Sequence, residues 1–499
     1  MATKYIVSNR SALSAKYRGE ILNIEAAFVP IVAADRQEGI TTTVLFLDDA
    51  AAMRAIGVRP VTQSDNEKQV KDAIDWIFAM VDPTYMTIFG APDVVPHQLL
   101  NNPVSDRDPD VPSDLPYASA SPFSRNVSNF LAPSRVVSRL PDLHGMPDTG
   151  GKDPEYPLRV LAKAADRTTG TVDDYRDYFA VSAEVWNEST TTSVTKIFGN
   201  ASALTLSPPN GPTWSPNQMS SKSFFVNAHG DDRSSTFSGQ KSSSYPTCLS
   251  SAFIRGTLST NMVFAVEACY GAQLYDPLFA SDQVMGIVNQ SVGDGCCGYF
   301  GSSNIAYGPP AGQGQADIIT QLFLKSVLAG KTVGQAALDA RQTFIGTQGM
   351  TNPTNLKTIG QFMLMADASF APVILPTTTY SLLLAREGAI VSTENERRAI
   401  ELQLATDHSE PAPEDPIPGF VSEAITRIAT EQKLTNYSVT PHRVVFNESH
   451  AHLYAELDMH VYEVLEEFER PGLTTPGYKS IEITATRDEI IAIEETFSK

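Results

Sequence analysis

The chain has 499 residues, of which 42% are hydrophobic and 9% aromatic, a composition typical of globular proteins that excludes a disordered chain. The formal net charge of −20 argues against nucleic acid or an anionic membrane as a partner, whereas a basic peptide would be attracted. Without a secretory signal, a membrane-length apolar run or a disulfide framework among its four cysteines, the chain is expected to be cytoplasmic.

The first 150 residues alternate between predicted strands and helices. Residues 41–50 predict a buried strand, and residues 66–81 carry apolar side chains at helical spacing. Residues 85–96 predict a second strand, which breaks at Gly90. Alternation of this kind predicts a mostly parallel sheet flanked by helices.

Residues 101–150 are rich in proline, aspartate and serine and predict a long loop region. Carboxylates are the ligands that calcium prefers, so a calcium site is one possible reading of this loop. The spacing matches no EF-hand, and a solvated loop is the favoured interpretation. The aspartates in question are Asp106, Asp108, Asp110 and Asp114.

Residues 155–375 repeat the alternating pattern. Strands are predicted over 177–186, 222–230, 261–271 and 293–308, and a pair of helices over 314–347. We therefore expect an α/β fold with a mostly parallel, helix-flanked sheet in two subdomains, an N-terminal one over residues 1–150 and a catalytic one over residues 151–378.

Residues 379–499 predict a separate small α+β module, expected to regulate access to the site or to recruit a partner, which begins with a charged helix and an acidic, proline-rich linker over 407–419. A strand is predicted over 449–460 and a final helix over 488–497. The strand would place His450 and His452 on one face, a spacing that zinc can use, but solvent-exposed histidines are the favoured interpretation.

Two apolar runs of strand length end on reactive residues. The run before His229 and the run before Cys269 each stop at or near a glycine, Gly230 or Gly271. In an open parallel sheet, ligands bind beyond the carboxyl ends of the strands, so two adjacent strands would bring these side chains to one crevice. The 40 residues between them leave room for a crossover between parallel neighbours.

These two residue types predict thiol chemistry. A thiolate attacks a carbonyl, and an imidazole delivers a proton to the leaving amine. The backbone N–H groups of Gly230 and Cys269 are placed to stabilise an oxyanion. A lone cysteine or histidine at a strand end is more often structural, and it is the paired pattern that favours catalysis.

The two motifs resemble those of a known family. The segments "NAHG" and "EACYGA" resemble the His-Gly and Cys-Gly motifs of caspase-like cysteine peptidases, the group of caspases, gingipains, clostripain and separase. The resemblance is closer to the gingipain-like branch and covers roughly residues 40–375. It also involves the segments "TIFGAPDVVP", "SDLPYA", "SRVVSRLPD" (with Ser138 where glycine is usual) and "GCCGYFGSSNIAYG".

The resemblance implies a His-Cys dyad and a defined cut site. Cys269 would be the nucleophile and His229 the general acid–base, with no third residue and no cofactor required. Cleavage after arginine or lysine is expected, with an aspartate preference through Arg233 or Arg255 as the lesser alternative. The residues expected to bind the substrate are Glu184, Glu188, Asp231, Glu267 and Tyr307, with Asp232 as a further candidate.

The function expected from the sequence is thus a cysteine endopeptidase acting on proteins or peptides with a basic residue at the cut site. Family analogy places it in a bacterial proteolytic defence or cell-death pathway, with an upstream activating protease or regulator. Self-processing at Arg386, Arg397 or Arg398 is one further hypothesis. The alternative functions are a catalytically silent scaffold that binds peptides or partner proteins, and a different thiol hydrolase or acyltransferase.

Overall fold

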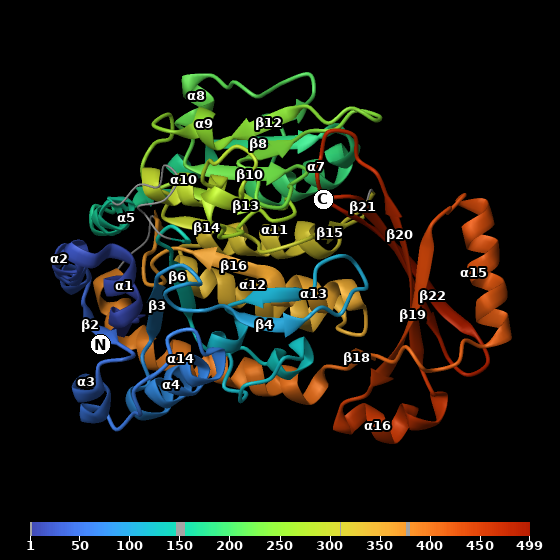
Figure 1. Cartoon of the computed structure of the whole chain (residues 1–499), viewed down its shortest axis with the longest axis horizontal. Helices are drawn as coiled ribbons and strands as arrows, with labels where there is room; N and C mark the ends of the chain where they lie inside the picture. The colour runs from blue at the N-terminus through green and yellow to red at the C-terminus, as the bar shows by residue number, and fades with distance from the viewer. Residues whose placement is uncertain (1, 146–154, 310, 376–379) are drawn as a thin grey trace.

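A ten-stranded sheet runs through the body of the molecule (Figure 1). The computed structural model describes residues 2–145, 155–309, 311–375 and 380–499. The strand order is β2-β1-β3-β6-β16-β14-β13-β10-β8-β9. All neighbours are parallel except β14 and β16. The predicted mostly parallel sheet is therefore confirmed. The strands are β1 (Ala2–Ser8), β2 (Ile40–Phe46), β3 (Tyr85–Phe89), β6 (Val137–Leu140), β8 (Tyr178–Ala183), β9 (Leu204–Ser207), β10 (Ser223–Asn227), β13 (Val263–Val266), β14 (Gly298–Ser302) and β16 (Phe362–Met365).

Two apolar cores lie on the two faces of this sheet. Successive side chains of a strand point to opposite faces, and the central strands β8, β10, β13 and β14 are buried at every position because both faces are covered. In β10, Phe224 and Val226 enter one core and Phe225 enters the other. In β13, Phe264 and Ala265 divide in the same way.

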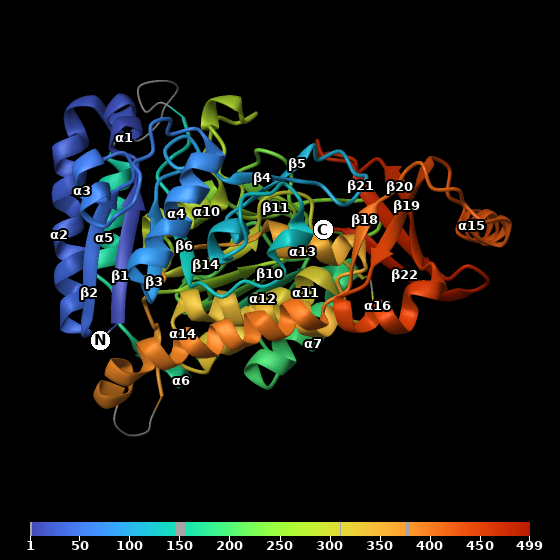
Figure 2. The same ribbon diagram turned by 90° about the horizontal axis from the view of Figure 1, so that it is seen from below.

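Helices cover both faces (Figure 2). The first core is closed by α1 (Arg10–Tyr17), α2 (Ile21–Gln37), α3 (Ala50–Ala55), α4 (Glu67–Val81), α5 (Tyr156–Ala165), α8 (Pro216–Met219), α9 (Ser251–Ile254) and α10 (Ile287–Asp294). The second is closed by α6 (Val172–Arg176), α7 (Asn187–Phe198), α11 (Gln315–Leu328), α12 (Val333–Gln348) and α13 (Pro353–Gln361). Short strands complete the body: β4 (Gln98–Asn101), β5 (Asp110–Ser113), β7 (Gly170–Thr171), β11 (Thr236–Ser238), β12 (Thr247–Ser250), β15 (Tyr307–Gly308) and β17 (Val373–Ile374).

Helix α14 (Tyr380–Ala405) runs along the body on the side of α12 (Figure 2). It carries Arg397 and Arg398, two of the arginines considered for self-processing, within regular helix, whereas the side chain of Arg386 lies outside the described part. Neither α14 nor any other helix in the described ranges combines the length and the apolar character needed to cross a membrane.

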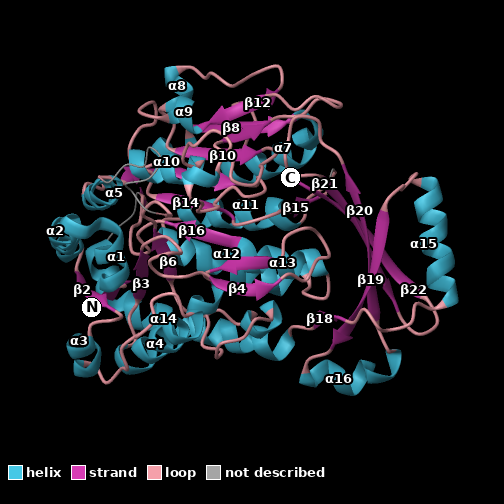
Figure 3. Ribbon diagram, in the orientation of Figure 1, coloured by secondary structure: helices cyan, strands magenta, loops and turns pink. Residues whose placement is uncertain are grey.

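A second, antiparallel sheet forms the C-terminal module, which we define as residues 408–499 (Figure 3). Its strands are β18 (His408–Pro411), β19 (Tyr437–Val445), β20 (His460–Phe468), β21 (Gly477–Ala485) and β22 (Ile490–Ser498), and the body strand β15 pairs with the edge strand β22. One face packs on α15 (Gly419–Glu431) through an apolar cluster, and α16 (Glu448–Tyr454) lies at the end of the sheet.

Two local predictions in this module are wrong. The helix predicted over 488–497 is strand β22, because it is paired on both sides, with β21 and with β15. The strand predicted over 449–460 begins as helix α16, because the Asn447 side chain accepts hydrogen bonds from the N–H groups of Ser449 and His450 and so caps a helix. His450 pairs with Asp407.

Candidate active site

The strands that precede His229 and Cys269 are neighbours in the sheet. Strands β10 and β13 run parallel with Val226 opposite Val266, so each reactive residue follows the paired segment by three positions. The expectation that the two residues stand at the same edge of the sheet is therefore confirmed.

Gly230 lies against the backbone of Cys269. A Cβ atom at position 230 would stand 1.6 Å from the carbonyl oxygen of Cys269 and 3.1 Å from its nitrogen. No side chain fits in that space, so any other residue would force the two segments apart. The glycine is what allows the histidine and cysteine segments to approach this closely.

The His229 imidazole is buried and fixed on all sides. The backbone N–H groups of His229 and Ser238 each donate to the other residue's carbonyl oxygen at 2.8 Å. The ring of His229 packs against Trp186 with centroids 4.4 Å apart. Nε2 lies 2.7 Å from Gln240 Oε1, and Nδ1 lies 2.8 Å from a guanidinium nitrogen of Arg470.

The two partners set the protonation of this ring. A guanidinium only donates, so Nδ1 accepts from Arg470 and the ring proton sits on Nε2, where it is donated to Gln240. Burial holds the pKa of His229 well below its usual value, and the positive charges of Arg470 and Lys499 add to this effect. The imidazole is therefore neutral, and both of its nitrogens are engaged.

The Cys269 thiol is fully buried. Its Sγ lies 3.3 Å from the backbone nitrogen and 3.5 Å from the carbonyl oxygen of Ala306. Burial raises the pKa of the thiol to about 11, with Arg470 opposing the shift. Tyr270, the next residue, has a φ of +54°, so the chain turns sharply directly after the cysteine.

A buried pocket beside Cys269 holds the side chain of Lys499. The Lys499 ammonium donates to Glu267 Oε2 at 2.8 Å, to Asn227 Oδ1 at 3.1 Å and to Asp317 Oδ1. It also lies 5.0 Å from the centre of the Trp186 ring, within the range of a cation–π contact. We call this site, formed by Asn227, Glu267, Asp317 and Trp186, the lysine pocket.

The charges of the lysine pocket require a cation. Burial raises the pKa of Glu267 well above its usual value; Lys499 opposes this shift, and Asp317 adds to it. Burial lowers the pKa of Lys499, but Asp317 and Glu267 outweigh it and raise that pKa. Two buried carboxylates without a positive partner would repel each other, so the ammonium is the group that lets both be buried.

The residues before Lys499 lie in an extended ladder next to Cys269. Ser498 and Phe497 pair antiparallel with Tyr307 and Gly308 of β15, and the Lys499 N–H donates to Ala306 O at 2.9 Å. The Cys269 N–H donates to the main-chain oxygen of Lys499 at 3.3 Å. A peptide that adds a strand to a sheet edge is bound in this way, with one side chain in a pocket.

Gly308 makes room for the lysine stem. A Cβ atom at position 308 would stand 2.2 Å from Lys499 Cε. The glycine therefore forms one wall of the lysine pocket and keeps it open to a long side chain.

The other residues predicted to bind substrate lie in different settings. Glu184 pairs with Lys241 near the surface, and Glu188 is exposed on α7. Asp231 accepts hydrogen bonds from the N–H groups of Thr474 and Thr475 in the C-terminal module. Tyr307 donates to Asp106 Oδ2 at 2.8 Å. Of this predicted set, Glu267 is the residue that contacts the lysine side chain.

The four aspartates considered for calcium are each paired with a protein cation. Lys357 bridges Asp106 and Asp108, Arg125 pairs with Asp110, and Arg139 with Asp114. Throughout the described ranges, no group of three or more histidine, cysteine or carboxylate side chains is arranged to hold a metal ion.

Several residues of this site were not identified from the sequence. Asn227 belongs to the segment "NAHG" but was given no role, Gln240 carried no motif, and Asp317 lies on a helix about 50 residues after the cysteine. Arg470 and Lys499 come from a module that was expected to be separate. The spacing of Glu267, two residues before Cys269, was the one available signal for the pocket.

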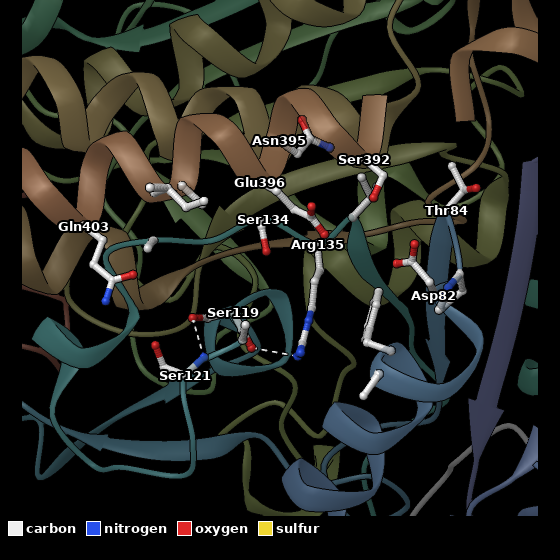
Figure 4. A pocket seen from close by; sticks show the side chains of 18 of the residues that line it. Asp82, Thr84, Ser119, Ser121, Ser134, Arg135, Ser392, Asn395, Glu396 and Gln403 are labelled. Atoms are coloured by element: carbon white, nitrogen blue, oxygen red, sulfur yellow. Dashed lines mark hydrogen bonds between the residues drawn. The ribbon is translucent and has the colours of Figure 1, made fainter. Parts of the chain in front are cut away.

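A cavity of about 570 Å³ lies elsewhere, between α4, the segment around Ser119 to Arg135 and α14 (Figure 4). The Arg135 guanidinium contacts the carbonyl of Ser119 and the carboxylate of Asp75. Neither His229 nor Cys269 lines this cavity, so it is not part of the candidate site.

Comparison with known proteins adds little. No protein-family model matches the chain, and no curated protein matches its sequence. One solved structure, described as "Structure of Protease", aligns over 99% of this chain and 96% of that chain with a TM-score of 0.45 and 12% sequence identity. A likeness this distant carries no conclusion about function.

Proposed function

We propose that the protein is a cysteine endopeptidase that cuts after a basic residue, with Cys269 as nucleophile and His229 as general acid–base. The observation that carries this proposal is the placement of Lys499. Its side chain fills a buried acidic pocket, and its main-chain oxygen faces the Cys269 N–H. A substrate bound in the same way would present its carbonyl carbon to the thiol.

The mechanism follows from this pose. The Cys269 sulfur attacks the carbonyl carbon, and the oxyanion accepts hydrogen bonds from the backbone N–H groups of Cys269 and Gly230. The imidazole of His229 takes the thiol proton and delivers it to the leaving amine, which forms the acyl-enzyme. A water molecule, activated by the same imidazole, then releases the acid and restores the thiol.

A basic cut-site preference rests on the lysine pocket. Two carboxylates, one amide oxygen and an indole face surround the ammonium, which leaves no partner for a substrate carboxylate. An acidic residue at the cut site would add a third buried negative charge, which is strongly unfavourable. The aspartate-directed alternative is accordingly disfavoured, and cytoplasmic proteins or peptides with lysine or arginine at the cut site are the proposed substrates.

The peptidase and the silent scaffold differ in one measurement. Fluorogenic peptides with Lys, Arg or Asp at the cut site are incubated with the protein and with Cys269→Ala. Because residues 497–499 occupy the site, the same assay is run on the double variant Arg470→Ala/Lys499→Ala. Hydrolysis of basic peptides that is lost in Cys269→Ala supports the peptidase. Binding of those peptides with no hydrolysis in any variant supports the scaffold.

A further inference from the structure

We propose that the C-terminal module is a detachable inhibitor of the site, holding the thiol and the imidazole inactive until it is displaced. This inference rests on the proposed function, since it assigns the regulation of the same site. Three independent contacts carry it: one in the lysine pocket, one on His229 and one across the face of the module sheet.

The first contact blocks the substrate path. Residues 497–499 occupy the edge of β15, and the Lys499 side chain fills the lysine pocket with no exposed surface. Its main-chain oxygen takes the hydrogen bond that the Cys269 N–H would give to a substrate carbonyl. A peptide substrate cannot enter while this segment is in place.

The second contact disables the imidazole. Arg470 lies in the loop between β20 and β21, where its guanidinium also donates to the carbonyls of Thr475 and Pro476. The loop is fastened to the body because Thr474 and Thr475 donate to Asp231. Arg470 is thereby held on His229 Nδ1, and Gln240 holds Nε2, so neither nitrogen can take the proton of the thiol.

The third observation concerns the face of the module that meets the body. Close to the site, Leu465 and Tyr478 pack against Cys269 and Tyr270. Farther along, the same face is polar, and only some of its groups are paired: the Ser105 N–H donates to Glu463 Oε2 at 3.1 Å, and the Asn352 side chain donates to Glu494 Oε2 at 2.7 Å. Its buried atoms without a hydrogen-bond partner are His442 Nδ1 and Nε2, Glu463 Oε1, Glu482 Oε2 and Thr496 Oγ1.

An interface of this kind is easy to reverse. Buried polar groups without partners cost free energy, which undocking returns when water reaches them. The opposite face of the sheet packs on α15 through its own apolar cluster, with Val421 and Ile425 on the helix and Ile481 on β21. The module therefore keeps a core of its own when it leaves the body.

The reactivity of Cys269 tests the inference without relying on peptide hydrolysis. The full chain carrying Arg470→Ala/Lys499→Ala is treated with iodoacetamide, and the alkylation of each cysteine is followed by peptide mass spectrometry. We expect Cys269 to react at least tenfold faster than in the wild type. Buried Cys248 reports on unfolding, and Arg443→Ala, an arginine of the module that pairs with Asp415, is the matched control.

A second measurement distinguishes loss of the inhibitory segment from unfolding of the double variant. A synthetic peptide of residues 490–499 is added to the double variant; it should slow Cys269 alkylation, whereas the same peptide ending in alanine should not. An unchanged Cys269 rate in the double variant, or a peptide without effect, overturns the inhibitor. Faster Cys269 alkylation in the double variant, without hydrolysis of any peptide, rejects the peptidase but supports the proposal that the C-terminal module blocks the site. Equal hydrolysis by the wild type and the double variant supports the peptidase and rejects the inhibitory role of the module.

Discussion

Replacing the carboxylates of the lysine pocket by their amides tests the charge argument directly. Asp317→Asn and Glu267→Gln keep the size of each side chain and remove one negative charge. Both are made in the Arg470→Ala/Lys499→Ala background, so that the tail does not compete with the substrate.

The structure ranks the two substitutions. A hydrogen bond between charged groups contributes about 1.5–3 kcal/mol, and each 1.4 kcal/mol is tenfold, so losing one pair should lower kcat/KM by about 10- to 150-fold. Burial raises the pKa of Glu267 well above its usual value and so disfavours its charged form, and for this reason the amide should cost less at Glu267 than at Asp317. We expect Asp317→Asn to lie near the upper limit and Glu267→Gln near the lower one.

The assay is steady-state hydrolysis of a lysine peptide, with Cys269 alkylation measured in parallel. Alkylation should stay within about twofold of the parent, because the change is in binding and not in the thiol. Asp339→Asn, which alters a carboxylate of α12 paired with Arg398, is the matched control. Both pocket variants within twofold of the parent on lysine peptides would refute the assignment of the lysine pocket.

Three further predictions concern the site and its supports. Gly230→Ala should destabilise the fold by at least the 1–3 kcal/mol or so typical of overpacking and abolish hydrolysis, because its Cβ would meet Cys269 O; thermal unfolding checks this against Gly19→Ala, whose Cβ meets nothing within 4 Å. Lys357→Met should cost about 3–5 kcal/mol in denaturant unfolding, because Asp106 and Asp108 would be buried without a cation, and added calcium that fully restored stability would contradict this account. Burial, with Glu463 and Glu494, raises the pKa of Glu482 to about 8, so the docked module favours the protonated acid. Docking should therefore be tightest in acid and weaken as the pH rises from the usual glutamate range to about 8. The ratio of Cys269 alkylation rates in wild type and Arg470→Ala/Lys499→Ala should rise over that window, and Glu482→Gln should flatten it.

The sequence predicted the body well because its signals are local. Apolar runs such as residues 224–226 are buried on both faces, and a run of that kind indicates a central parallel strand without knowledge of its neighbours. The edge position of His229 and Cys269 follows from the same runs, since parallel strands end at a common edge.

The tail could not be predicted in this way. Residues 490–498 alternate weakly and carry two glutamates, and they form a strand only because β21 and β15 flank them. Whether Lys499 or another cation fills the lysine pocket depends on contacts between residues 182 to 272 positions apart in the chain. Glu267 was predicted to bind substrate, but its partners could not be predicted, because they come from α11 and from Lys499, directly after β22.

The order of the segments along the chain has a consequence for synthesis. The residues of the site, from Trp186 to Asp317, leave the ribosome well before Arg470 and Lys499. Roughly 150 residues separate Asp317 from Arg470, which at about 5–20 residues per second is a delay of about 8–30 s. If the module is the inhibitor, each nascent chain passes through an interval in which the site can assemble uncovered. The length of this interval depends on how slowly the body folds. If the body finishes folding only after the module has been synthesised, the site is never uncovered.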